Sequence, residues 1–181
     1  MNQADPADVE LELLIGLFFE QPSLLGAFEE TEPTQLPNCE QHLLAHDHHM
    51  TVTLEEHHNS LVDVKVLQTC SEADSYSRKI LLTRQSDGVV VQFGIVRLDL
   101  SVLEPEVRTE IESQSTPLGR ILIEHDVLRE VKLLNLYKIE CGDELSQSFG
   151  LPQGETCYGR TALIYCNGSP AIELLEIVAN G

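Results

Sequence analysis

The feature that most constrains the fold is a block of alternating apolar and polar residues between Met50 and Leu100. Four segments repeat with a period of two, the spacing of a strand with one buried face: residues 50–57, 61–68, 77–84 and 88–100. Their separators, HHNS, TCSEADSY and QSDG, are short and rich in turn-forming residues, which favours hairpins over parallel crossovers. The block therefore predicts an antiparallel meander of four strands.

The C-terminal part of the chain predicts one more hairpin. The runs CYGRTALIYC (157–166) and PAIELLEIV (170–178) are β-rich and are joined by the turn sequence NGS. Before them, residues 104–113 begin with acid and proline and place Val107 and Ile111 four apart, as in a short helix. Residues 117–134 (PLGRILIEHDVLREVKLL) continue with mostly helical spacing, so we expect a helical insertion.

The first fifty residues predict helices and a loop. Residues 8–19 turn apolar after an acidic start, and a second short helix is expected from Pro22. Residues 30–49 carry two prolines and predict a loop with one helical turn around 40–45. The 181 residues contain no Pro/Gly/Ser-rich linker, so we predict one α+β domain (1–181): N-terminal helices and a His-rich loop over 1–49, then an antiparallel sheet of about six strands with its helical insertion over 50–181.

The charge balance restricts the partners of this chain. Thirty Asp and Glu residues against eleven Lys and Arg residues give a formal net charge of −19, which repels nucleic acid and anionic lipid. The N-terminus lacks a signal-like apolar segment, and the five cysteines form no C-x-x-C pair, which favours free thiols in a reducing compartment. We expect a cytoplasmic protein, monomeric or dimeric, without nucleic-acid or membrane partners.

Motifs for metal, nucleotide or nucleophile chemistry are weak or missing. Histidines with a nearby carboxylate can bind zinc, and this chain gathers them between His42 and His58 around Asp47. However, there is no H-E-x-x-H pattern, and polar loops commonly collect histidines. The G-x-S-x-G elbow and the glycine-rich phosphate loops are also missing. We therefore predict no metal and no cofactor.

Charged residues inside apolar strands are the stronger candidates. Arg78 and Arg160 each alternate with apolar residues, so each side chain shares a mainly apolar strand face. An edge position, a snorkelling stem or an internal salt bridge explains such an arginine without a ligand. Glu173 and Glu176 raise the same question in the last strand, and alternation does not say which of the two faces inward.

The segment STPLGRIL (115–122) places a Pro-Leu-Gly-Arg turn before an apolar helical run. One interpretation is an ordinary helix N-terminus with Ser115 or Thr116 as cap and Pro117 in the first position. The other is a turn whose free backbone N–H groups, at the positive end of the helix dipole, receive a carboxylate.

Taken in order, YSRKILLTRQSDGVVVQFGIVRL (76–98), STPLGRIL and YGRTALIYCNGSPAIELLEIV (158–178) resemble the chorismate pyruvate-lyase (4-hydroxybenzoate synthase) family. The likeness covers roughly residues 50–178. It implies a six-stranded antiparallel sheet whose helical flaps enclose a ligand. It also implies cofactor-free cleavage of chorismate to 4-hydroxybenzoate and pyruvate, a step of aromatic (for example quinone) biosynthesis.

The resemblance further implies roles for individual residues. Arg78 would grip the ring carboxylate through its guanidinium fork, and the backbone N–H of Leu118 would add a second donor. Glu176 would lie near the departing enolpyruvyl ether and assist proton movement. Arg160 and Arg97 would bind the enolpyruvyl carboxylate or form internal salt bridges.

One part of the family pattern is altered. Its members carry a Ser-Met-Thr segment before the sheet, whose methionine touches the product. The nearest position in PSLLGAF is Leu24, and no threonine follows it there.

Two further classes of function stay open. UTRA-type effector-binding domains of transcription regulators use the same fold to hold small molecules without reacting them, so the chain is alternatively a non-catalytic binder of an aromatic carboxylate. A purely structural or interaction protein is the third possibility. A closed pocket containing both Arg78 and Glu176 favours the lyase, whereas a pocket that lacks either favours the binder.

Overall fold

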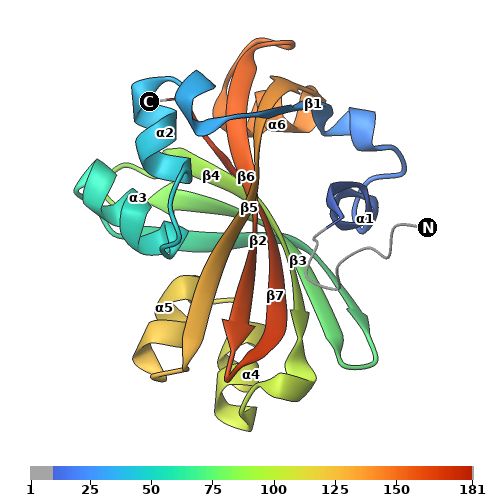
Figure 1. Cartoon of the computed structure of the whole chain (residues 1–181), viewed down its shortest axis with the longest axis vertical. Helices are drawn as coiled ribbons and strands as arrows, with labels where there is room; N and C mark the ends of the chain where they lie inside the picture. The colour runs from blue at the N-terminus through green and yellow to red at the C-terminus, as the bar shows by residue number, and fades with distance from the viewer. Residues whose placement is uncertain (1–9, 181) are drawn as a thin grey trace.

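A seven-stranded antiparallel sheet forms the centre of the molecule in the computed structural model, which describes residues 10–180 (Figure 1). The strand order is β1-β5-β6-β7-β4-β3-β2. The strands are β1 (Gly26–Thr31), β2 (Val62–Glu72), β3 (Ser75–Arg84), β4 (Val90–Asp99), β5 (Arg129–Cys141), β6 (Thr156–Cys166) and β7 (Ser169–Val178). The predicted α+β class and antiparallel sheet are confirmed, with seven strands in place of about six.

Short helices connect the strands and cover the sheet. The α-helices are α1 (Leu11–Gly16), α2 (Asn38–Leu44), α3 (Met50–His58), α4 (Pro105–Glu112), α5 (Leu118–Glu124) and α6 (Asp143–Phe149). Single 3-10 turns lie at η1 (Pro22–Leu24), η2 (Pro33–Gln35) and η3 (Leu100–Val102). Along residues 10–180, no helix has the length and apolar character needed to cross a membrane.

Most of the predicted strands are present. β2, β3 and β4 pair in chain order, and β6 pairs with β7 across Asn167 and Gly168. These two turn residues have φ angles of 52° and 82°, and positive φ at both central positions is what an Asn-Gly type I′ turn requires. β7 then pairs with β4, so it lies in the middle of the sheet.

The prediction of a strand over residues 50–57 is wrong, because this segment forms helix α3. Its buried side chains are Met50, Thr51 and Leu54, a spacing that fits one face of a helix, whereas Val52 is exposed. Asn59 ends the helix in the left-handed conformation (φ 47°), so the separator HHNS serves as a helix C-cap.

The helical interpretation of residues 117–134 is correct only for its first part. Helix α5 ends at Glu124, Asp126 adopts a positive φ of 51°, and β5 begins at Arg129. This long strand pairs with β1 and β6. Side chains of these neighbouring strands bury the apolar residues of β5, whose spacing in the sequence had suggested a helix.

The N-terminal prediction also needs correction. The helix predicted over 8–19 is seen as α1, and its first two positions lie outside the described residues. The second helix is only the turn η1, after which the chain enters β1. Gly26 allows this pairing, because a Cβ there would lie 2.6 Å from the carbonyl oxygen of Glu140 in β5.

The sheet separates two groups of helices, and alternate residues of each strand face them. One face packs its buried side chains with α1 and α6, as Phe93, Ile95 and Leu175 do. The other face lies under α2, α3, α4 and α5, which Figure 1 shows away from α1. Arg78, Arg160 and Glu176 share the parity of this second face.

Candidate functional site

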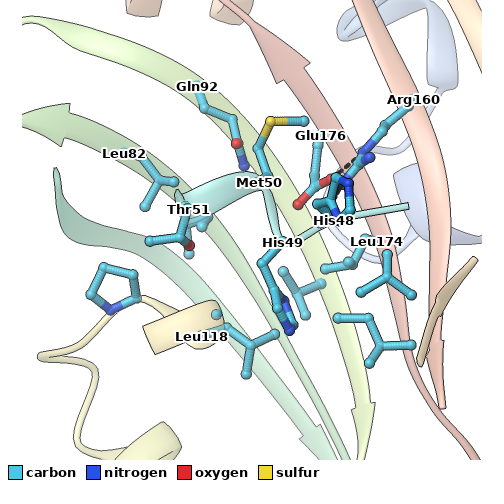
Figure 2. A pocket seen from close by; sticks show the side chains of 16 residues that line it. His48, His49, Met50, Thr51, Leu82, Gln92, Leu118, Arg160, Leu174 and Glu176 are labelled. Atoms are coloured by element: carbon cyan, nitrogen blue, oxygen red, sulfur yellow. Dashed lines mark hydrogen bonds and ion pairs between the residues drawn. The ribbon is translucent and has the colours of Figure 1, made fainter. Parts of the chain in front are cut away.

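A pocket lies on this second face, between the sheet and its helical cover (Figure 2). Its cavity is small in this structure, about 30 Å³. The floor comes from β3, β4, β6 and β7, one side wall from Val131 of β5, and the cover from the start of α3 and the start of α5. The lining residues are His48, His49, Met50, Thr51, Ile80, Leu82, Gln92, Val96, Pro117, Leu118, Gly119, Val131, Arg160, Ile164, Leu174 and Glu176.

Glu176 and Arg160 are the charged pair of this pocket. They stand directly opposite each other on β7 and β6, and Arg160 Nε donates to Glu176 Oε2 at 2.7 Å. Both are buried, with 1% of the surface of Arg160 and 6% of that of Glu176 exposed. The ion pair neutralises the two charges inside the protein. Glu173 pairs instead with Arg97 on the opposite face of the sheet. Glu176 is thus the inward-facing carboxylate of the last strand.

Both terminal nitrogens of Arg160 also have partners. Nη1 donates to the carbonyl oxygen of His46 at 2.7 Å and to that of Leu44 at 3.4 Å, and Nη2 donates to that of His48 at 3.1 Å. This guanidinium therefore joins the last carbonyl of α2 and two carbonyls of the segment after it to Glu176 of the sheet.

Arg78 has a very different environment on the same face. It is completely buried, yet its one hydrogen bond is a long contact of 3.4 Å from Nη1 to the carbonyl oxygen of Ile111 in α4. Its Nε and Nη2 have no partner among residues 10–180. Burial lowers the pKa of this guanidinium, and the nearby Tyr76 raises it to a smaller extent. An arginine stays charged even so, which makes Arg78 a buried cation without a counterion.

The pocket and Arg78 are neighbours, but the guanidinium is outside the pocket wall. Val96 and Leu174 follow Arg78 in one row across β3, β4 and β7, and both line the pocket. Arg78 itself does not line it. The structure thus brings Leu118, Arg160 and Glu176 together at the pocket and leaves Arg78 outside its lining.

The Pro-Leu-Gly-Arg turn forms one end of the pocket cover. Pro117 precedes α5, and neither Ser115 nor Thr116 caps the helix with its side chain. Gly119 lets α5 approach α3 closely, because a Cβ there would lie 2.9 Å from Thr51 Oγ1. Arg120 fixes the same contact through an ion pair with Glu55 of α3. The turn therefore positions Leu118 over the pocket by packing against α3.

Histidines that the sequence left without a role also line the pocket or its rim. His49 accepts a hydrogen bond from Arg129 Nε at 2.6 Å, and burial together with the charges of Arg129 and Arg160 lowers its pKa to about 4. Burial and the charge of Arg160 lower the pKa of His46 as well. Among residues 10–180, no three His, Cys, Asp or Glu side chains gather closely enough to hold a metal ion.

Leu24 does not belong to this site. It lies in η1 with 52% of its surface exposed, and it is not among the lining residues. Met50 and Thr51 line the pocket instead. Sequence reasoning missed them because residues 50–57 were interpreted as a strand, although the Met-Thr dipeptide in HHMTVTLEE repeats the last two residues of the family's Ser-Met-Thr segment. Gln92 was also missed; it is buried, and its Oε1 has no partner among residues 10–180.

Comparison with known proteins gives a likeness in fold. No protein-family model matches the chain, and a search of curated proteins finds no match. The effector domain of PhnF from Mycobacterium smegmatis superposes with a TM-score of 0.52 at 13% identity, covering 74% of this chain and 89% of that domain. Whole PhnF gives 0.52 at 10% identity, covering 73% of this chain.

A possible transcriptional regulator, YydK from Bacillus subtilis, gives a TM-score of 0.46 at 14% identity, covering 65% of this chain. The match spans 58% of YydK and 64% of whole PhnF. The fold of this chain is that of UTRA-type effector-binding domains.

Proposed function

We propose that this domain binds a small organic anion, an aromatic carboxylate of the size of 4-hydroxybenzoate, without reacting it. The observation that carries the proposal is the buried guanidinium of Arg78 next to the pocket, with two nitrogens that have no partner among residues 10–180. A buried unpaired charge is strongly unfavourable, and a bound carboxylate would neutralise it with a bidentate hydrogen bond. The fold shared with the PhnF effector domain supports a binding role.

The spacing of Arg78 and Glu176 suits the two ends of such a ligand. Arg78 and Glu176 lie one strand apart across β4 and two residues apart along the strands, so their Cα atoms are separated by roughly 12 Å. The carboxylate would bind toward Arg78 and a hydroxyl would donate to Glu176 or to the unpartnered Oε1 of Gln92. The cavity of about 30 Å³ must widen to admit an aromatic ring, and wall side chains must move to expose Arg78, so binding includes a local rearrangement.

Calorimetric titration with 4-hydroxybenzoate tests this function, with the neutral analogue 4-hydroxybenzyl alcohol beside it. We expect the carboxylate to bind and the alcohol to bind at least about 100-fold more weakly, because the alcohol leaves Arg78 unpaired. Arg78→Met should abolish that preference. Arg84→Met is the matched control, because Arg84 is on the same strand but forms a half-exposed pair with Asp87. Equal affinity for both compounds, or retained preference in Arg78→Met, would contradict the proposal.

Chorismate pyruvate-lyase activity is the second candidate. Three features of the resembling family support it: Leu118, Glu176 and a Met-Thr pair meet at one pocket. Purified protein is incubated with chorismate, and 4-hydroxybenzoate and pyruvate are both quantified. Equal amounts of the two products would establish the lyase. Binding of 4-hydroxybenzoate without turnover of chorismate would leave the binding function alone.

A further inference from the structure

The segment Ala45–His49, here called the strap, lies between the pocket and a groove on the surface. It joins α2 to α3 without regular secondary structure. His48 and His49 line the inner pocket and also an open surface groove, whose other side is formed by residues 126–131. A ligand that passes between groove and pocket must therefore pass the strap.

Polar bonds, and little apolar packing, hold the strap in place. Asp47 Oδ1 accepts from the backbone N–H of Leu133 in β5 at 2.8 Å, and Arg129 Nε donates to His49 Nε2 at 2.6 Å. Arg160 contributes the bonds to the carbonyls of His46 and His48 from below. All five strap residues are at least partly exposed, whereas Leu44 before the strap and Met50 after it are buried. The strap is thus a weakly packed segment between two well-packed ends.

We infer that Arg160 is a positioning residue that locks the strap over the pocket and couples it to Glu176, and that it does not bind the ligand itself. Each of its nitrogens already has a partner: Nε on Glu176, Nη1 on His46, and Nη2 on His48. Four of its five N–H groups are used in this way, so an anion that took more than the second N–H of Nη2 would displace a carbonyl or Glu176. Glu176, in contrast, keeps its second oxygen, Oε1, free of any hydrogen bond within residues 10–180 and it lines the pocket.

Only the binding kinetics described below rest on the proposed function; the lock on the strap does not. Hydrogen exchange followed by mass spectrometry on the ligand-free protein tests the lock directly. The amides of His46 and His48 are hydrogen-bonded to the Leu44 carbonyl and to His46 Nδ1, so their exchange reports strap opening. In Arg160→Lys the charge beside Glu176 is kept, but one ammonium cannot span the same carbonyls. We expect at least 10-fold faster exchange of these two amides.

Two other variants complete the experiment. Asp47→Ala removes the bond to Leu133 at an exposed side chain and leaves the buried pair intact, so it should also accelerate exchange, and it keeps the test valid if Arg160→Lys folds poorly. Arg97→Lys is the matched control, because Arg97 pairs with Glu173 of the same strand β7 on the other face. It should leave strap exchange unchanged.

Stopped-flow binding of 4-hydroxybenzoate gives the second readout. With the strap unlocked, association and dissociation should both accelerate at least 5-fold in Arg160→Lys, while Kd changes less than 3-fold. A large loss of affinity with unchanged strap exchange would overturn the inference and make Arg160 a ligand contact. If the wild-type protein fails to bind 4-hydroxybenzoate, the proposed function fails, and the exchange measurements still decide whether Arg160 locks the strap.

Discussion

Two buried arginines on one face of the sheet, Arg160 and Arg78, have opposite surroundings. Arg160 donates to a carboxylate and to three backbone carbonyls, whereas Arg78 makes one long contact to a carbonyl. Both are almost completely excluded from solvent. The difference teaches that burial alone does not define the role of a charged residue: the satisfied arginine holds the protein together, and the unsatisfied one requires a partner that this chain does not supply among its described residues.

The largest expected effect is the loss of stability on replacing Arg160, the arginine whose hydrogen bonds are made. Arg160→Met should lower the free energy of unfolding by about 3–5 kcal/mol, because it leaves Glu176 as an unpaired buried charge and frees several carbonyls. Denaturant unfolding of the ligand-free protein measures this change. The double variant Arg160→Met/Glu176→Gln should recover part of the loss, and an equal loss in both variants would show that the ion pair is not the cause.

The second largest expected effect is a loss of stability in acid, through His49 of the strap that Arg160 holds. The pKa of His49 is lowered to about 4 by burial and by Arg129, Arg160 and His48, against 6.5 for the unperturbed group. The unfolded chain therefore binds more protons between these values, so the stabilisation present above pH 6.5 is lost as the pH falls toward 4. We expect a loss of up to about 3 kcal/mol in the free energy of unfolding.

His49→Gln tests this pH dependence. The variant cannot titrate at this position, so the difference in stability between pH 7 and pH 4.5 should be smaller than in the wild type. An identical pH profile in the two proteins would remove His49 as its source.

Replacing Arg78, the arginine with unpaired nitrogens, should change the free energy of unfolding in the opposite direction. Arg78→Met should raise the free energy of unfolding of the ligand-free protein by about 2 kcal/mol, because an apolar side chain of similar length replaces an unpaired buried charge. Thermal unfolding of Arg78→Met and Arg160→Met side by side gives the comparison. If both substitutions lower the stability, the contrast between the two arginines does not hold, and Arg78 has a structural partner.

The smallest expected effect concerns the charge of the whole molecule. With a net charge of −19, the protein repels an anionic ligand before it reaches Arg78. Raising the salt concentration from 20 to 200 mM should therefore increase the association rate of 4-hydroxybenzoate by about 2- to 5-fold, opposite to the usual salt effect on an anion and a basic site. A neutral analogue that binds the same pocket should show no such increase.

Regular patterns made the sheet predictable in part. Alternation and turn residues identified β2, β3, β4, β6 and β7, and the Asn167-Gly168 turn has the geometry that its sequence predicts. The prediction of a strand over 50–57 was wrong because Thr-Val-Thr-Leu alternates by chance, whereas the buried residues of this segment have the spacing of one helix face. β1 was missed because it is stabilised by pairing with β5, a contact between residues more than a hundred positions apart, and β5 was missed because its first residues continue the helical spacing of α5.

The candidate site was predictable to a similar degree. Arg78, Glu176 and Leu118 stood out as residues of a resembling family or as charges in apolar strands, and the last two line the pocket. The partners of Arg160 could not be predicted, because the carbonyls it holds lie 112 to 116 positions earlier in the chain. The role of Met50 was missed together with helix α3.

The unpaired Arg78 also has a consequence for the amount of this protein in a cell. A ligand that binds only the folded chain adds to its stability by mass action, about 2.7 kcal/mol at a hundredfold excess over Kd. The fraction of molecules open to proteases falls accordingly, and differences of this size change steady-state abundance several-fold. Under the proposed function, the buried guanidinium weakens the empty form, and the cellular level of this protein would follow the supply of the bound anion.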